Sequence, residues 1–121
     1  LSKGSREAAL IEMAVLKLLG PSTAVTFHRR MFATPGRADR AKALGVARAI
    51  RLDPDAVEEI AAPDPEVEAA LAAQMQLAER LSLAATPSFV IGTTAILGYP
   101  GPKAMQRVID AYRRCEVIVC R

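Results

Sequence analysis

Two cysteines near the carboxy-terminal end are the residues of this chain best suited to redox chemistry. Cys115 and Cys120 stand five positions apart, which spans about 16 Å in an extended strand and about 7.5 Å along a helix axis. A disulfide needs Cα atoms within about 7 Å of each other. Pairing with each other therefore requires a turn through residues 116–119, a run typical of a strand. We expect thiols that are free or paired with another molecule, with an internal disulfide as the alternative.

The other candidate groups do not form a catalytic or metal-binding set. His28 is the only histidine, so no histidine cluster or cysteine–histidine pair is evident, and we expect a helix-surface or packing role. Several acids lie close together but lack the spacing and the glycine of a calcium loop. We interpret most of them as helix caps and first-turn charges, and we predict no metal and no cofactor. These acids are Asp53, Asp55, Glu58, Glu59, Asp64, Glu66 and Glu68.

A basic stretch follows His28, and its cations outnumber the one acid among them, Asp39. A solvated helical face is the simpler interpretation, because interleaved aromatics for base stacking are missing and so is an Asn/Gln-rich recognition helix. We expect no nucleic-acid partner. A basic helical nucleic-acid-binding or protein-interaction module remains the alternative from another class. The cations are Arg29, Arg30, Arg37, Arg40, Lys42, Arg48 and Arg51.

Length and composition favour one folded, mainly helical domain. The 121 residues are enough for one core, and 51% of them are hydrophobic while only 4% are aromatic. Because Ala, Leu, Ile and Val carry the apolar content, helices are favoured over a β-sandwich. No apolar run reaches about 18 residues without interruption, so we expect no membrane span. We also expect no signal peptide in this chain, since a charged-then-apolar leader is missing.

Helical periodicity and capping residues account for the chain up to residue 81. Ser5, Asp53 and Asp64 are the expected N-caps, and Gly20-Pro21 should end the first helix. The predicted helices span residues 6–19, 22–32, 37–50, a short segment from 54, and 65–81. The expected buried positions are Ala41, Leu44, Ala47 and Ile50 in the third helix, Val57 and Ile60 in the fourth, and Val67, Leu71, Met75, Ala78 and Leu81 in the fifth.

The pattern changes after residue 82. Residues 88–91 and 94–97 predict two antiparallel strands joined by a tight turn at Gly92-Thr93. A last amphipathic helix over 101–114 should turn its apolar side chains inward, namely Met105, Val108, Ile109 and Tyr112. A two-stranded hairpin is only marginally stable alone. We therefore predict an α/β fold in which a helical insertion precedes a β-hairpin and a C-terminal helix.

The segment 81–98 resembles a stretch of the DsbA-like thiol–disulfide oxidoreductases. In both, a long helix ends, a dipeptide such as Thr86-Pro87 follows, and an antiparallel hairpin begins. The likeness extends to residues 1–9 and 27–32, which are similar to the start and the second helix of the family's helical insertion. It covers nearly the whole chain to about Arg114, and its specificity lies in the order of the elements.

The resemblance implies a partial thioredoxin-like fold, with a helical insertion over 1–82 and the C-terminal β-β-α part over 83–121. It implies a cis bond before Pro87 and a substrate-binding loop of Ala85, Thr86 and Pro87, in which the backbone before the proline can pair with an extended substrate. The family's nucleophile is the first Cys of a Cys-x-x-Cys at a helix N-terminus. This chain has no such unit, so we assign no catalytic residue.

The function implied is disulfide formation or isomerisation in cysteine-containing polypeptides, in the periplasm or another exported location. We expect the intact protein to be the enzyme, with its redox unit before Leu1, and the chain alone to be inactive; a naturally truncated product is the alternative. Relatives of 2-hydroxychromene-2-carboxylate isomerase and kappa-type glutathione transferase are the runner-up interpretation within the fold. Because strands are missing, we also predict self-association through the exposed hairpin edge.

Overall fold

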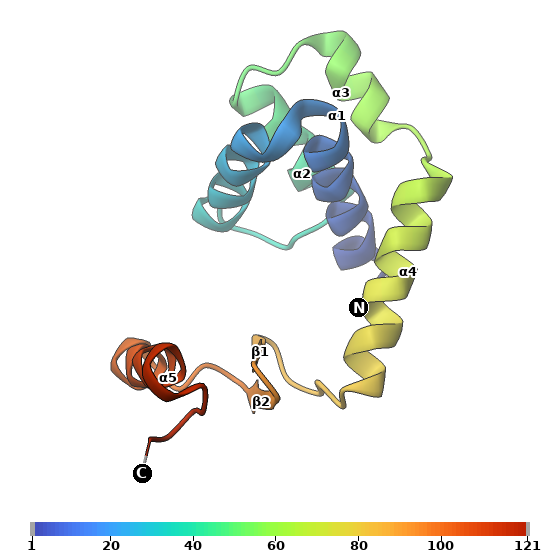
Figure 1. The fold of residues 1–121 in the computed structure, drawn as a ribbon. Coiled ribbons are helices and arrows are strands. Elements are labelled where there is room, and N and C mark those ends of the chain that lie inside the picture. The colour runs from blue at the N-terminus through green and yellow to red at the C-terminus, as the bar shows by residue number, and fades with distance from the viewer. Residues whose placement is uncertain (1, 121) are drawn as a thin grey trace. The chain divides into compact units, whose positions relative to one another are not determined.

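The computed structural model describes residues 2–120 and separates into two compact units, Leu1–Ala72 and Ala73–Arg121. The described residues form five helices and one two-stranded antiparallel sheet, as Figure 1 shows. The predicted mixed α/β class is confirmed at this level, and most of the structure is helical. The units divide inside α4 (Pro65–Arg80), whereas the sequence-based boundary after residue 82 follows that helix.

The first helix, α1 (Lys3–Ala33), is a bent span of two arms. Gly20 has a φ of 83° and a ψ of 173°, outside the helical region, and Pro21 follows it. The proline lacks the N–H that would continue the helical hydrogen bonds, so the predicted break is confirmed, and the bend can be followed in Figure 1. The predicted N-cap was wrong: Ser2 caps the helix, and its hydroxyl accepts the Ser5 N–H at 3.2 Å.

Two short helices pack against α1, and aspartates begin both of them. Asp39 caps α2 (Arg40–Ala49) by accepting the Lys42 N–H at 2.9 Å, and Asp53 caps α3 (Pro54–Ala61) by accepting the Asp55 N–H at 2.9 Å. The predicted cap at Asp53 is therefore confirmed. The predicted start of α2 near Arg37 was too early, because the aspartate cap fixes the first turn at Arg40.

The core of the first unit lies between α1, α2 and α3. The predicted burial of Ala47, Val57 and Ile60 is confirmed. Leu44 and Ile50 are partly buried against this core, but Ala41 is exposed, so that prediction was wrong. Packing against α1 buries Ala43 and Val46 of α2 instead. The buried cluster comprises Ala8, Ile11, Ala14, Val15, Phe27, Met31, Ala43, Val46, Ala47, Val57 and Ile60.

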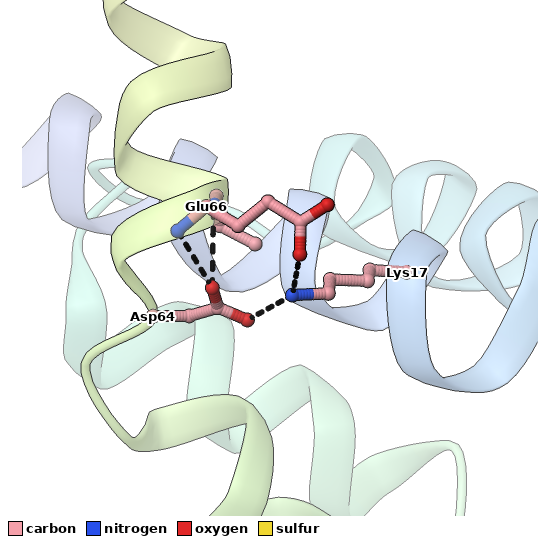
Figure 2. A network of polar contacts seen from close by, with 4 residues as sticks. Lys17, Asp64 and Glu66 are labelled. Carbon is pink, nitrogen blue, oxygen red and sulfur yellow. Dashed lines mark hydrogen bonds and ion pairs between the residues drawn. The ribbon is translucent and has the colours of Figure 1, made fainter.

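A polar network fastens the start of α4 to α1 (Figure 2). The Lys17 ammonium lies 2.8 Å from the Asp64 carboxylate and 2.6 Å from that of Glu66. Asp64 also accepts the N–H groups of Glu66 and Val67 at 3.0 and 3.2 Å, which confirms it as the cap of α4. Its hydrogen bond with Lys17 holds the pKa of Asp64 below its ordinary value, and the same bond raises the pKa of Lys17.

The apolar stripe predicted along α4 is buried only at its start. Val67 and Leu71 are buried and Ala78 is half-buried, but Met75 and Leu81 are both 43% exposed. A helical period predicts which residues share a face, but burial also needs a partner surface. The prediction for Met75 and Leu81 was therefore wrong in this structure.

The second unit contains the hairpin and the last helix. Strands β1 (Ser88–Ile91) and β2 (Thr94–Leu97) have the predicted bounds, and α5 (Pro102–Cys115) follows them. The strands pair antiparallel, with Ser88 opposite Leu97 and Ile91 opposite Thr94. Ala111 is the buried residue of α5. The residues predicted to face inward are half-buried, namely Met105, Val108, Ile109 and Tyr112.

Candidate functional site

The loop between α4 and β1 holds the three residues predicted to bind substrate. Ala85, Thr86 and Pro87 are all exposed, and the Thr86-Pro87 peptide bond is cis. The Ser88 hydroxyl donates to the Ala85 carbonyl and so closes the loop at the start of β1. The structure thus brings the three residues together at an accessible place, directly before the hairpin.

The chain leaves α4 through a residue with a left-handed backbone. Ser82 has a φ of 53°, and its N–H donates to the Glu79 carbonyl at 2.9 Å while the Leu83 N–H donates to the Ala78 carbonyl at 2.9 Å. This pair of bonds is the Schellman arrangement that ends many helices, usually with glycine at the left-handed position. It stops α4 before the loop and fixes the direction in which the chain enters residues 84–87.

The hairpin is apolar on both faces, but only one face is covered. Side chains alternate along a strand, and one face carries the half-buried Phe89, Ile91, Thr94 and Ile96. On the opposite face Val90 is 51% and Leu97 is 55% exposed. A strand pair that is apolar on both faces is typical of a sheet covered on both sides.

The turn of the hairpin is fixed by a close contact with α5. Gly92 has a φ of 59°, and a Cβ atom at this position would overlap the ring of Tyr112. Gly92 therefore serves two purposes, since it adopts a left-handed backbone without strain and gives Tyr112 room to lie against the turn. The sequence indicated the turn through Gly92-Thr93 but gave no sign of the partner ring.

The two cysteines form a disulfide with each other, which corrects the preferred expectation of free or externally paired thiols. Their Cα atoms lie 6.1 Å apart. The strand predicted over 116–119 is absent from the described structure, where these residues form a bend instead. Glu116 takes a left-handed backbone with a φ of 56°, and its N–H donates to the Tyr112 carbonyl at 2.9 Å. This cap reverses the chain and brings Cys120 back to the end of α5.

The lone histidine joins the two arms of α1. His28 Nδ1 lies 2.6 Å from a Glu12 carboxylate oxygen, and its ring centroid lies 4.7 Å from that of Phe32. The His28 side chain is 55% exposed. It therefore lies on the helix surface in a local polar contact, which is the predicted surface role.

The charged segments are used for local structure. Arg40 donates to the Ala61 carbonyl at 2.8 Å, and Lys42 donates to the Gly36 carbonyl at 3.1 Å. Asp53 and Asp64 are caps, as the sequence indicated. Among residues 2–120 no group of three His, Cys, Asp or Glu side chains is arranged to hold a metal ion.

Helix α1 is long and apolar enough to cross a membrane when length and composition alone are considered. This is weak evidence, because the core helix of a water-soluble domain passes the same test, and α1 supplies Ile11, Val15 and Phe27 to the core. The prediction that the chain has no membrane span is not confirmed by this structure and stays a prediction.

Comparison of the chain with protein-family models, curated proteins and solved structures found no match in any of the three.

Proposed function

We propose that this chain is the substrate-docking part of a DsbA-like thiol–disulfide oxidoreductase, built on the C-terminal portion of a thioredoxin-like fold. The observation that carries the proposal is the exposed loop Ala85–Pro87, which leads directly into a two-stranded hairpin whose outer face and edges are open. The order of helical segment, Thr-Pro loop, hairpin and closing helix also supports it. In the intact enzyme, a reactive thiolate supplied by a longer chain would face this loop.

The register of the hairpin shows which backbone groups are free for a substrate. Ile91 and Thr94 flank the two-residue turn, so they form a hydrogen-bonded pair. Antiparallel pairing alternates between hydrogen-bonded and non-hydrogen-bonded pairs, and the N–H and C=O groups of Val90 and Ser88 therefore point away from β2. This outer edge continues into Thr86. An extended peptide can add to such an edge through main-chain hydrogen bonds.

A binding measurement tests the docking loop. A fluorescently labelled, extended peptide that contains cysteine should bind the chain, and Thr86→Arg should weaken that binding about tenfold or more, because a long charged side chain occupies the place of the peptide. The matched control is Ala73→Arg, which adds the same charge at another exposed residue of the second unit. Equal binding by the two variants would contradict the docking role.

The proposal assigns no redox step to the chain by itself. We predict that the 121-residue chain has no dithiol oxidase or disulfide reductase activity. The check is an insulin-reduction and a peptide-oxidation assay on the chain and on its Cys115→Ser/Cys120→Ser variant. A clear signal that persists in the double variant would show that another group of this chain performs the redox step. The proposal that the chain only docks the substrate would then be wrong.

The internal disulfide supports an exported location. Disulfides form and persist in oxidising compartments such as the periplasm, and they are rare in the reducing cytosol. Cys115 and Cys120 are the chain's two cysteines, and both belong to this bond. We therefore propose that the protein works in the periplasm or outside the cell.

A further inference from the structure

The end of α5 and the residues after it form a small loop closed by the disulfide. Cys115 is the last residue of α5, Glu116 turns the chain, and the bond to Cys120 closes a ring that contains residues 116–119. We call residues 116–120 the disulfide loop. Val117 is 51% and Val119 is 70% exposed, while Ile118 is half-buried. The loop therefore turns one of its three apolar side chains toward the protein.

The disulfide loop forms one wall of a cavity of about 400 Å³ at the turn end of the hairpin. Ile91, Thr93 and Thr94 from the hairpin and its turn, and Tyr112 from α5, also line this cavity. Tyr112 is the ring that lies against Gly92. The position of the loop thus decides whether this end of the hairpin, with Ile91 and Tyr112, is sheltered or open.

Few other interactions hold the loop in place. Within residues 2–120 the last backbone hydrogen bond is the one from the Glu116 N–H to the Tyr112 carbonyl, and none involves residues 117–120. Apart from the partial burial of Ile118, the covalent bond between the two cysteines fixes the loop. Breaking that bond would free the loop without removing any backbone hydrogen bond from the hairpin or from α5.

The surroundings of the sulfurs do not favour a reactive thiolate. Cys115 Sγ lies 3.0 Å and Cys120 Sγ 3.4 Å from the Ala111 carbonyl oxygen. Both sit at the C-terminal end of α5, where the helix dipole is negative. Catalytic thiolates are found in electropositive places such as helix N-termini. The pair therefore suits slow switching between two states better than rapid turnover.

We propose that the Cys115–Cys120 disulfide is a redox latch that holds the disulfide loop over the turn end of the hairpin. A dithiol reductant opens it in two exchange steps. One thiolate attacks a cysteine sulfur, the internal S–S bond breaks, and a mixed disulfide forms. The reductant's second thiol then displaces the cysteine, so the reductant leaves as a disulfide and the protein gains two electrons and two protons as two thiols. This inference does not depend on the docking function of residues 85–87.

Backbone ¹⁵N NMR relaxation tests the latch on the full chain. Treatment with dithiothreitol should lower the order parameters of the disulfide loop from about 0.85 to below about 0.6, as expected when a held segment becomes flexible. The amide resonances of Thr93 and Thr94 should shift, because the loop leaves the cavity that they line. Order parameters at Phe89 and Ile96 should stay at about 0.85, because their ladder is intact.

The Cys115→Ser/Cys120→Ser variant is the matched control. Its order parameters should match those of the reduced protein, and dithiothreitol should change nothing further in it. Ile118→Ser, which keeps the disulfide, should remain closed at the loop. Unchanged order parameters of the loop and an unshifted Thr93 resonance on reduction would overturn the latch. A uniform fall of the order parameters across both strands would also overturn it, since the bond would then stabilise the whole unit.

Discussion

Replacing Gly92 with alanine should destabilise the second unit, and the structure indicates by how much. The left-handed backbone at Gly92 costs a non-glycine residue about 1–2 kcal/mol. The new methyl group would also overlap the Tyr112 ring, and overpacking of this kind costs about 1–3 kcal/mol. We therefore expect Gly92→Ala to lower the free energy of unfolding by about 2–5 kcal/mol, the sum of the two terms.

Tyrosine fluorescence during urea unfolding is a suitable assay, because the chain has two tyrosines and no tryptophan. Tyr99 and Tyr112 both lie in the second unit, so the signal reports on that unit alone. Each variant's free energy of unfolding follows from linear extrapolation to zero denaturant.

Gly98→Ala is the matched control. Gly98 also has a left-handed backbone, with a φ of 79°, but a Cβ atom there meets nothing within 4 Å. The control should lose only the backbone contribution, so Gly92→Ala should cost about 1–3 kcal/mol more. In a Tyr112→Leu background, which removes the ring, this difference should shrink. Equal losses for the two glycines would refute the contact between the turn and α5.

Three further results are expected. Phe27→Ala should lower the free energy of unfolding of the first unit by about 3–5 kcal/mol, because Phe27 is fully buried. Phe32→Ala, at an 80% exposed residue of the same helix, should change it by less than about 0.5 kcal/mol. Far-UV circular dichroism during unfolding measures both values, and comparable losses would contradict the burial of Phe27 in the core. The hydrogen bond with Lys17 lowers the pKa of Asp64 below its ordinary value of 3.8. The stabilisation by this ion pair is therefore present above pH 3.8 and is lost as the pH falls through the lowered pKa of Asp64. Because the pKa of Lys17 is raised above 10.5, the ion pair is also lost as the pH rises through the raised pKa of Lys17. Asp64→Asn keeps a capping side chain and should reduce the fall in the free energy of unfolding at acidic pH. An unchanged fall at acidic pH would argue against the ion pair. Light scattering should show self-association through the open hairpin edges at high concentration, and a monomer throughout would contradict it.

The elements set by local chemistry could be predicted from the sequence. Asp53-Pro54 and Asp64-Pro65 combine a capping side chain with a proline in the first helical turn, and both begin helices in the structure. Gly92-Thr93 between two apolar runs gave the hairpin with its observed bounds. The three residues of the candidate loop also lie together as predicted, because they are adjacent in the chain.

The features set by distant contacts or by an unusual backbone conformation could not be predicted in this way. The packing of α2 against α1 decides that Ala41 is exposed and Ala43 buried. The disulfide was missed because the β-branched residues 117–119 are typical of a strand, whereas the left-handed backbone at Glu116 reverses the chain. Glutamate gives no local sign of that backbone, which glycine and asparagine usually supply. The contact of Tyr112 with Gly92 likewise joins residues far apart in sequence.

An NMR titration tests the central claim most directly, namely that the loop before the hairpin docks an extended peptide. The ¹⁵N-labelled chain would be titrated with an extended peptide that contains cysteine, and its amide shifts followed. The account predicts that the largest shifts fall on Ala85, Thr86, Ser88 and Val90, the loop and the outer edge of β1. Shifts confined to the basic helix α2, or none at millimolar peptide, would contradict it.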